Sequence, residues 1–219
     1  MRSRGLLIVF EGLDKSGKST QSKLLCEALR DKSYSSELWR YPERETSIGK
    51  LINSYLCKQI ELDDHAVHLL FSANRWETLD RMKHKLSEGI HLIADRYAYS
   101  GVAYTSAKTG FDFDRCKQTD TGLPKPDLVC FMDNKSMCLD ERDTYGEERY
   151  ERNDFQKIVY ENFQKLFNLE SDSGVQLNND LLVLNAKNSI QSIHEVIFEN
   201  VFNVIENQQA TMTPLGKLW

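Results

Sequence analysis

The chain has 219 residues, of which 40% are hydrophobic and 28% are charged, with three Trp, nine Tyr and ten Phe. This composition excludes a disordered, collagen-like or low-complexity chain and predicts a single folded domain over residues 1–219. The formal net charge of −5 has the wrong sign for a protein that coats nucleic acid, so any bound phosphate must meet a local cluster of basic residues.

The cysteine pattern and the lack of long apolar runs indicate the compartment. The five cysteines are an odd number without a C-x-x-C pair, and we interpret them as reduced thiols. The apolar run over 5–10 is too short for a signal peptide, and no run approaches the roughly 18 residues of a membrane span. We therefore expect a cytoplasmic protein, with the nucleus as a further compartment, that has neither membrane nor nucleic acid as a partner.

Short apolar runs alternate with longer helical patterns along the chain. The runs predict strands over 6–10, 37–41, 90–94, 127–131 and 181–184. The patterns between them predict helices over 18–30, 48–57, 63–86, after Tyr99, and over 155–167 and 190–205. This alternation predicts an α/β fold with a five-stranded parallel sheet flanked by helices.

One segment differs in composition from the rest of the chain. The stretch from Asp133 to Asp154 is rich in acidic residues and arginines and has few apolar anchors. Such a stretch packs poorly, so it is either a solvated surface loop or a lid that closes on a substrate.

The segment from Gly12 to Ser19 matches the phosphate-binding pattern G-x-x-x-x-G-K-[ST] at every position. A predicted strand runs into it and a predicted helix runs out of it, which is the context that this pattern requires. The glycines let backbone N–H groups converge on phosphate oxygens, and the start of the helix adds positive partial charge. Lys18 would bridge the outer phosphates and Ser19 would bind Mg²⁺.

An aspartate follows the strand predicted over 90–94. Asp95 stands where folds of this kind hold their metal through water, so together with Ser19 it is either a Mg²⁺ partner or a base. GTPases read guanine with N-K-x-D, but the segment from Asn134 to Met137 lacks the final acid. An ATPase that translocates or acts on DNA would need a longer chain or a basic face. A small kinase remains.

Three arginines predict an acceptor that carries a phosphate. Arg44 follows the strand over 37–41, Arg75 lies on the long mid-chain helix, and Arg96 follows Asp95 directly. Guanidinium groups suit a phosphate dianion, for which a nucleoside kinase has no need. Phe71 stands one helical turn before Arg75, so this pair could stack on a base and bond to its edge, although core packing alone would also explain Phe71.

Several separated segments together resemble one known family. They are 7–21 (LIVFEGLDKSGKSTQ), 41–44 (YPER), 68–77 (HLLFSANRWE), 95–104 (DRYAYSGVAY), 122–127 (GLPKPD), 148–151 (ERYE) and 214–219 (PLGKLW). In these segments the chain resembles the thymidylate kinases, most of all the eukaryotic and poxvirus type. The resemblance implies a P-loop nucleoside-monophosphate-kinase fold with a mobile lid over approximately 133–154, and ATP-dependent phosphorylation of thymidine monophosphate (dTMP) to dTDP in dTTP synthesis. It also implies a Mg²⁺ cofactor and a homodimer assembled through mid-chain helices.

The resemblance further implies roles for residues that match the family's motifs. Asp14 would hold the sugar 3′-hydroxyl, and Arg44 and Arg96 would grip the acceptor phosphate. Phe71 would stack on thymine, and Arg75 would bond to its O4. Tyr150 would crowd the 2′ position of the sugar. The other residues that would line this part of the site are Tyr41, Ser100, Gly101 and Tyr104.

For the donor, the resemblance implies contacts from the phosphate loop and from two later residues. The predicted ATP-binding residues are Gly12, Leu13, Asp14, Lys15, Ser16, Gly17, Lys18, Ser19, Thr20, Arg142 and Lys187. The predicted catalytic residues are Asp14, Lys15, Lys18, Arg96 and Arg142, and the predicted metal ligands are Ser19 and Asp95. Two alternatives stay open: a kinase for uridylate or deoxycytidylate, and a nucleotide-binding module without catalytic activity that acts through partners.

Overall fold

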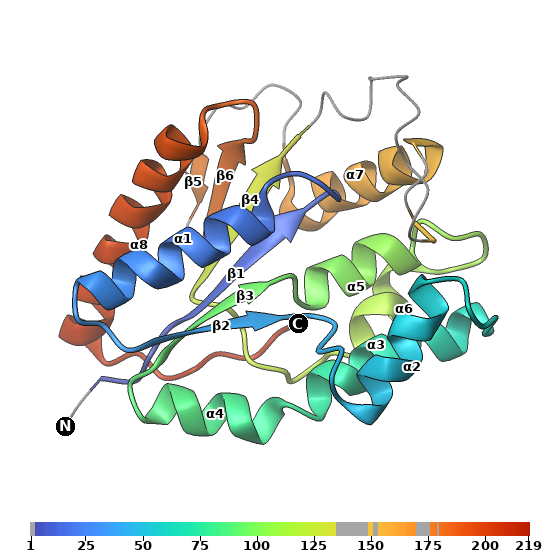
Figure 1. Cartoon of the computed structure of the whole chain (residues 1–219), viewed down its shortest axis with the longest axis horizontal. Helices are drawn as coiled ribbons and strands as arrows, with labels where there is room; N and C mark the ends of the chain where they lie inside the picture. Colours follow the sequence, from blue (N-terminus) through green and yellow to red (C-terminus); the bar gives the residue numbers. More distant parts are fainter. Residues whose placement is uncertain (1–2, 135–148, 151–152, 170–175, 179) are drawn as a thin grey trace.

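A β-sheet forms the centre of the molecule, with helices against both of its faces (Figure 1). The structure is a computed structural model that describes residues 3–134, 149–150, 153–169, 176–178 and 180–219. In spatial order the strands are β2 (Ser36–Arg40), β3 (His91–Asp95), β1 (Leu7–Gly12), β4 (Leu128–Asp133), β6 (Leu181–Asn185) and β5 (Gln176–Asn178). All but β5 are parallel, which confirms the predicted five-stranded parallel sheet. The short β5 was not predicted and pairs with β6 in the antiparallel sense at the sheet edge.

The helices lie in two layers and in one lateral group. The first layer contains α1 (Lys18–Asp31) and α8 (Ile190–Thr211), and the opposite layer contains α4 (Leu79–Ser87), α5 (Ala98–Thr105) and α7 (Asn153–Phe167). The lateral group near α5 contains α2 (Ser47–Leu56), α3 (Asp64–Trp76) and α6 (Phe113–Gln118) (Figure 1). Within the described part of the chain, no helix is long and apolar enough to cross a membrane.

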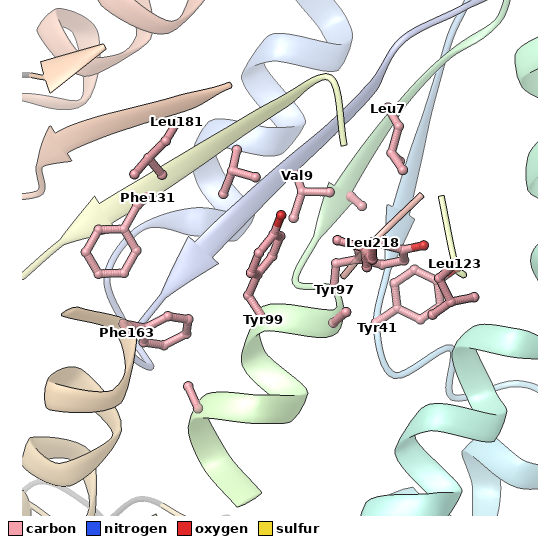
Figure 2. Packing of buried hydrophobic residues seen from close by; sticks show 14 of the residues in the cluster. Leu7, Val9, Tyr41, Tyr97, Tyr99, Leu123, Phe131, Phe163, Leu181 and Leu218 are labelled. Atoms are coloured by element: carbon pink, nitrogen blue, oxygen red, sulfur yellow. The ribbon is translucent and has the colours of Figure 1, made fainter. Parts of the chain in front are cut away.

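The central strands are buried on both faces because successive side chains of a strand point in opposite directions. Leu7 and Val9 of β1 belong to the apolar cluster beneath α5 and α7, which Figure 2 shows from close by. Ile8 and Phe10 belong to the cluster beneath α1 and α8. Two-sided burial explains why these strands read as continuous apolar runs, and it holds the end of β1 in a fixed place.

The last residues of the chain pack into the first of these clusters. Leu218 is 2% exposed and lies beside Tyr41, Tyr97 and Leu123 (Figure 2). The Leu218 N–H donates to the Leu123 carbonyl at 2.8 Å, and the Gly122 N–H donates to the Leu218 carbonyl at 3.2 Å. The segment around Leu123 is therefore fixed to the C-terminal residues.

The single helix expected over 63–86 is wrong, because the chain forms two helices, α3 and α4, with a break at residues 77–78. The Thr78 hydroxyl donates to the Arg75 carbonyl at 2.8 Å and shares a hydrogen bond of 2.5 Å with the Tyr41 hydroxyl. A threonine that bonds back to a carbonyl of the preceding turn competes with regular helical bonding. The break turns α4 toward β3, while α3 continues beside α5.

The strand order determines where a ligand can bind. β1 lies between β3 and β4, and each of these parallel strands ends at the same edge of the sheet. The segment from Gly12 to Ser19 leaves β1 at this edge, and Arg96 follows β3 there. In open α/β sheets, ligands bind outside the carboxyl ends of the strands, so a ligand site is expected at this edge.

Candidate active site

A cavity of about 290 Å³ lies at this edge, between the phosphate loop, α3 and α5. Predicted site residues from five separate segments line it: Asp14, Lys15, Lys18, Ser19, Tyr41, Arg44, Phe71, Arg75, Asp95, Arg96, Ser100, Gly101, Tyr104 and Tyr150. The other lining residues are mainly apolar or aromatic. A cavity lined by cationic and aromatic side chains suits a small anionic ligand that carries a ring.

The phosphate loop packs closely against β4. Gly12 has a φ of 139°, and a Cβ atom there would lie 2.7 Å from the Met132 carbonyl oxygen, so only glycine fits. Gly17 has a φ of 92° and forms the left-handed N-cap of α1. These two glycines turn the chain sharply from β1 into α1, as the sequence pattern predicts.

Lys18 is a buried lysine at the centre of this loop, with 5% of its surface exposed. Its ammonium group donates to the Leu13 carbonyl and, at 3.2 Å, to the Ser16 hydroxyl. Burial, with a smaller contribution from the nearby charge of Arg96, lowers the pKa of Lys18 to about 7. An anion beside Lys18 would favour its charged form, so the loop is prepared for a phosphate.

Ser19 and Asp95 form the candidate magnesium site. The Ser19 hydroxyl donates to the Asp95 carboxylate, which is 4% exposed and has the Arg40 Nε atom at 3.9 Å. Among the described residues there is no group of three or more His, Cys, Asp or Glu side chains that could hold a metal by themselves. One hydroxyl and one carboxylate beside a phosphate loop nevertheless fit Mg²⁺, which takes oxygen ligands and obtains most of them from phosphates and water.

Arg96 reaches into the phosphate loop from the turn between β3 and α5. Its backbone is left-handed, with a φ of 69°, and its guanidinium donates to the Gly12 carbonyl at 3.1 Å and to the Ser100 hydroxyl at 2.9 Å. It also forms an ion pair with the Asp14 carboxylate. Burial alone would raise the pKa of Asp14, but the charges of Arg96 and Lys18 hold that pKa below its usual value. The Asp14 side chain is thus an ionised hydrogen-bond acceptor next to two basic side chains.

Two buried polar residues that we did not predict support this arrangement. The Glu11 carboxylate accepts hydrogen bonds from the Tyr97 N–H at 2.9 Å and from the N–H and hydroxyl of Ser100. Gln156 of α7 donates to Asp14 at 2.8 Å. Glu11 gave a signal in the sequence, because it is a charge that directly follows an apolar run, whereas Gln156 gave none.

Several aromatic side chains line the cavity or pack behind its lining. The ring of Tyr150 stacks on Phe155 with a centroid distance of 5.3 Å and meets the Tyr104 ring edge-on at 5.8 Å. Phe71 is half-buried; it lines the cavity and also packs against the small cluster between α2 and α3. One side of Phe71 therefore packs in the core and another borders the cavity, and its stacking on a base stays a prediction.

Three predictions fall elsewhere. Lys187 is exposed in the turn after β6 and does not line the cavity. Arg142 and most of the proposed lid over 133–154 lie outside the described residues. Thr20 is exposed in the first turn of α1. The donor side of the site thus receives less support from the geometry than the acceptor side.

The fold and the cavity define a P-loop nucleoside-monophosphate kinase, because a phosphate loop shares one edge of a parallel sheet with a cationic cavity for a second ligand. Residues 10–197 match the sequence model of the thymidylate kinase family. A human thymidylate kinase is 48% identical over 216 residues, which cover 99% of this chain and 98% of the human protein, and a zebrafish (Danio rerio) thymidylate kinase is 46% identical with the same coverage. The solved thymidylate kinase of Candida albicans is 34% identical, covers 100% of both chains and superimposes with a TM-score of 0.79. The chain belongs to the thymidylate kinase family, whose members are phosphotransferases of nucleotide biosynthesis.

Proposed function

We propose that this chain is a MgATP-dependent kinase that converts dTMP to dTDP on the path to dTTP, with residues 1–219 as one catalytic domain. The observation that carries the proposal is the position of Lys18 and Arg96 on the same cavity, where Arg96 forms an ion pair with Asp14 and the charges of both lower the pKa of Asp14. Two cationic side chains near the Asp14 carboxylate suit a reaction in which two phosphate groups approach each other. The aromatic side chains that line the cavity supply a place for a pyrimidine ring.

Transfer of the γ-phosphoryl group depends mainly on positioning and on neutralising charge. ATP binds along residues 12–20, with Lys187 near its base, and Lys18 contacts the transferring group. Arg44 and Arg96 hold the phosphate of dTMP, and Lys15 and Arg142 add positive charge around the transferring oxygens. When bound beside Ser19 and Asp95, Mg²⁺ supplies charge neutralisation to the donor phosphates. The acceptor phosphate is already an anion, so no general base is needed.

The nucleoside part of dTMP occupies the rest of the cavity. Asp14 accepts a hydrogen bond from the sugar 3′-hydroxyl, and Tyr150 crowds the position where a ribonucleotide carries its 2′-hydroxyl. Thymine stacks on Phe71 and accepts a hydrogen bond at O4 from Arg75. The walls of this part are Tyr41, Ser100, Gly101 and Tyr104. The position of these residues around one cavity supports the assignment.

An ADP-release assay with MgATP tests the proposal by offering thymidine, dTMP, dUMP, uridylate and deoxycytidylate in parallel. We expect the highest kcat/KM with dTMP. A preference for thymidine would overturn the role of Arg44 and Arg96, and a preference for deoxycytidylate would overturn that of Arg75. A protein that binds ATP but turns over none of the acceptors would be a binding module instead of a kinase.

The proposal includes a homodimer that forms through the mid-chain helices. Exposed apolar side chains support it: Leu51 of α2 is 39% exposed, and Leu69 and Trp76 of α3 are 58% and 37% exposed. Light scattering coupled to gel filtration would measure the mass in solution. A particle of about 25 kDa at micromolar concentration would contradict a stable dimer.

The proposal also places the enzyme in the cytoplasm, with the nucleus as a further compartment. The described cysteines (Cys26, Cys57, Cys116 and Cys130) are free thiols, which supports a reducing environment. Fluorescence microscopy of the tagged full chain would test this location.

A further inference from the structure

A buried ion pair stands behind the cavity wall, between Arg75 of α3 and Asp120 in the turn after α6. The two side chains are 2% and 0% exposed. The Arg75 Nε atom donates to Oδ1 of Asp120 at 3.1 Å, and one terminal nitrogen donates to Oδ2 at 2.6 Å. Such a bidentate contact fixes the plane of the guanidinium as well as its position.

The contact with Asp120 does not use all the N–H donors of Arg75, so the side chain can also donate to a ligand. A guanidinium has five N–H donors, of which the contact with Asp120 uses two. Arg75 also lines the cavity. Gly101 of α5 also lies against the guanidinium, and a Cβ atom there would lie 2.7 Å from a terminal nitrogen of Arg75. The guanidinium is therefore enclosed by Asp120 and Gly101, and its remaining donors have little freedom of direction.

Asp120 is itself held in place by α3. The Ser72 hydroxyl lies 2.8 Å from Oδ1 of Asp120 and 2.9 Å from the Thr119 carbonyl oxygen. The Trp76 indole N–H donates to the same carbonyl at 2.8 Å. The position of the carboxylate is thus determined by the neighbouring turns of the helix that carries Arg75.

We infer that Asp120 is a positioning residue for base selection: it holds the Arg75 guanidinium so that its remaining donors face an acceptor on the pyrimidine and disfavour a donor there. This inference rests on the proposed role of Arg75. Thymine presents the O4 acceptor at this edge, whereas cytosine presents an amino group. A guanidinium that cannot turn away leaves the cytosine amino group without a partner, and an unpaired buried polar group discriminates strongly.

The test is steady-state kinetics of the full chain with dTMP and deoxycytidylate, for wild type and Asp120→Asn. Asparagine keeps the shape of aspartate but loses the charge and the bidentate contact. We expect KM for dTMP to rise about tenfold, the preference for dTMP over deoxycytidylate to fall about tenfold, and KM for ATP to stay within about twofold. Asp114→Asn is the matched control, because Asp114 is also an ion-paired aspartate near Asp120 in sequence but its side chain is 82% exposed.

A double-mutant cycle with Arg75→Met separates positioning from a purely structural role. If Asp120 acts through Arg75, adding Asp120→Asn to Arg75→Met changes the preference by less than about twofold. Thermal unfolding of each variant identifies loss of fold. Should Asp120→Asn not fold, Ser72→Ala weakens the hold on Asp120 while keeping its charge, and it should lower the preference about two- to threefold.

A folded Asp120→Asn enzyme that keeps KM for dTMP and the preference within twofold would overturn the inference, as would an unchanged preference in Ser72→Ala when Asp120→Asn does not fold. The ion pair would then serve only to join α3 to the turn after α6. A parallel rise of KM for ATP and for dTMP would also overturn it. The proposed function fails in a different way: wild type would not prefer dTMP, or Arg75→Met would leave the preference intact.

Discussion

Replacement of Lys18 by methionine tests whether the buried lysine that binds an anion lowers the free energy of unfolding of the ligand-free protein. The lysine is buried without a phosphate beside it, and its pKa falls to about 7 from an ordinary value of 10.5. Methionine has a similar length and no charge. The variant should therefore lose activity while its ligand-free form becomes more stable, a combination expected where function requires a strained site.

The magnitude follows from the pKa. At pH 7 the unfavourable burial of the ammonium group lowers the free energy of unfolding by on the order of 4 kcal/mol. The variant also loses the hydrogen bonds from Lys18 to Leu13 and Ser16, which together contribute about 1 to 2 kcal/mol. The net expectation is a ligand-free variant that is more stable than wild type by about 2 to 3 kcal/mol at pH 7. Its kcat/KM should be lower by a factor of about 10² to 10³.

Urea denaturation of the ligand-free proteins measures the difference, with Lys23→Met as the control because Lys23 lies on the same helix with its side chain 68% exposed. The folded chain binds fewer protons than the unfolded chain between about pH 7 and 10.5. The free energy of unfolding of wild type should accordingly rise with pH over this range, and that of Lys18→Met should rise less. A variant that is less stable than wild type, or a wild-type curve that is flat from about pH 7 to 9.5, would refute the reasoning.

Three further perturbations have defined outcomes. Leu218→Ala should lower the free energy of unfolding by about 3 kcal/mol in urea, since it removes a buried leucine; a loss below about 1 kcal/mol would mean that the last residues lie outside the cooperative core. Gln156→Ala removes the amide that holds Asp14, so KM for dTMP in the ADP-release assay should rise about tenfold with KM for ATP within about twofold, and an effect on ATP alone would contradict this role. Burial raises the pKa of Glu11 above 4.5, so the folded chain binds more protons than the unfolded chain and wild-type stability should fall as the pH rises from 4.5 through the raised pKa. In urea denaturation, the free energy of unfolding of Glu11→Gln should fall less steeply with pH than that of wild type does. An equal slope in the two proteins would contradict the raised pKa of Glu11.

The fold could be predicted because its signals are local. Strands buried on both faces are continuous apolar runs, and the phosphate loop marks a strand-to-helix turn by itself. The break at residues 77–78 could not be predicted, since the helical pattern continues through it. The Thr78 hydroxyl that bonds back to the Arg75 carbonyl there is also held by Tyr41, a residue distant in sequence. The strand β5 has only three residues, too few to show a period of two.

The site could be predicted where motifs or strand ends carry it. Residues 12–19 form one motif, and Asp95 follows a predicted strand. Asp120 and Gln156 could not be found in this way, because their contacts with Arg75 and Asp14 span 45 and 142 residues of sequence. Only the folded chain brings such pairs together, and an isolated aspartate or glutamine has no pattern that distinguishes it from a surface residue.

The polar contacts of the site divide between two sets of segments. Arg96, on the turn after β3, bonds to Asp14 and to the Gly12 carbonyl, and Lys18 bonds within the same loop after β1. Arg75 is held instead by Asp120, on a turn that neighbours the C-terminal residues. If Asp120 positions Arg75 as inferred, mutations in the second set would alter which pyrimidine is accepted, whereas the residues proposed for phosphoryl transfer would stay unchanged. An engineer who seeks activation of a new nucleotide analogue should vary the turn at Asp120 before the walls of the phosphate loop.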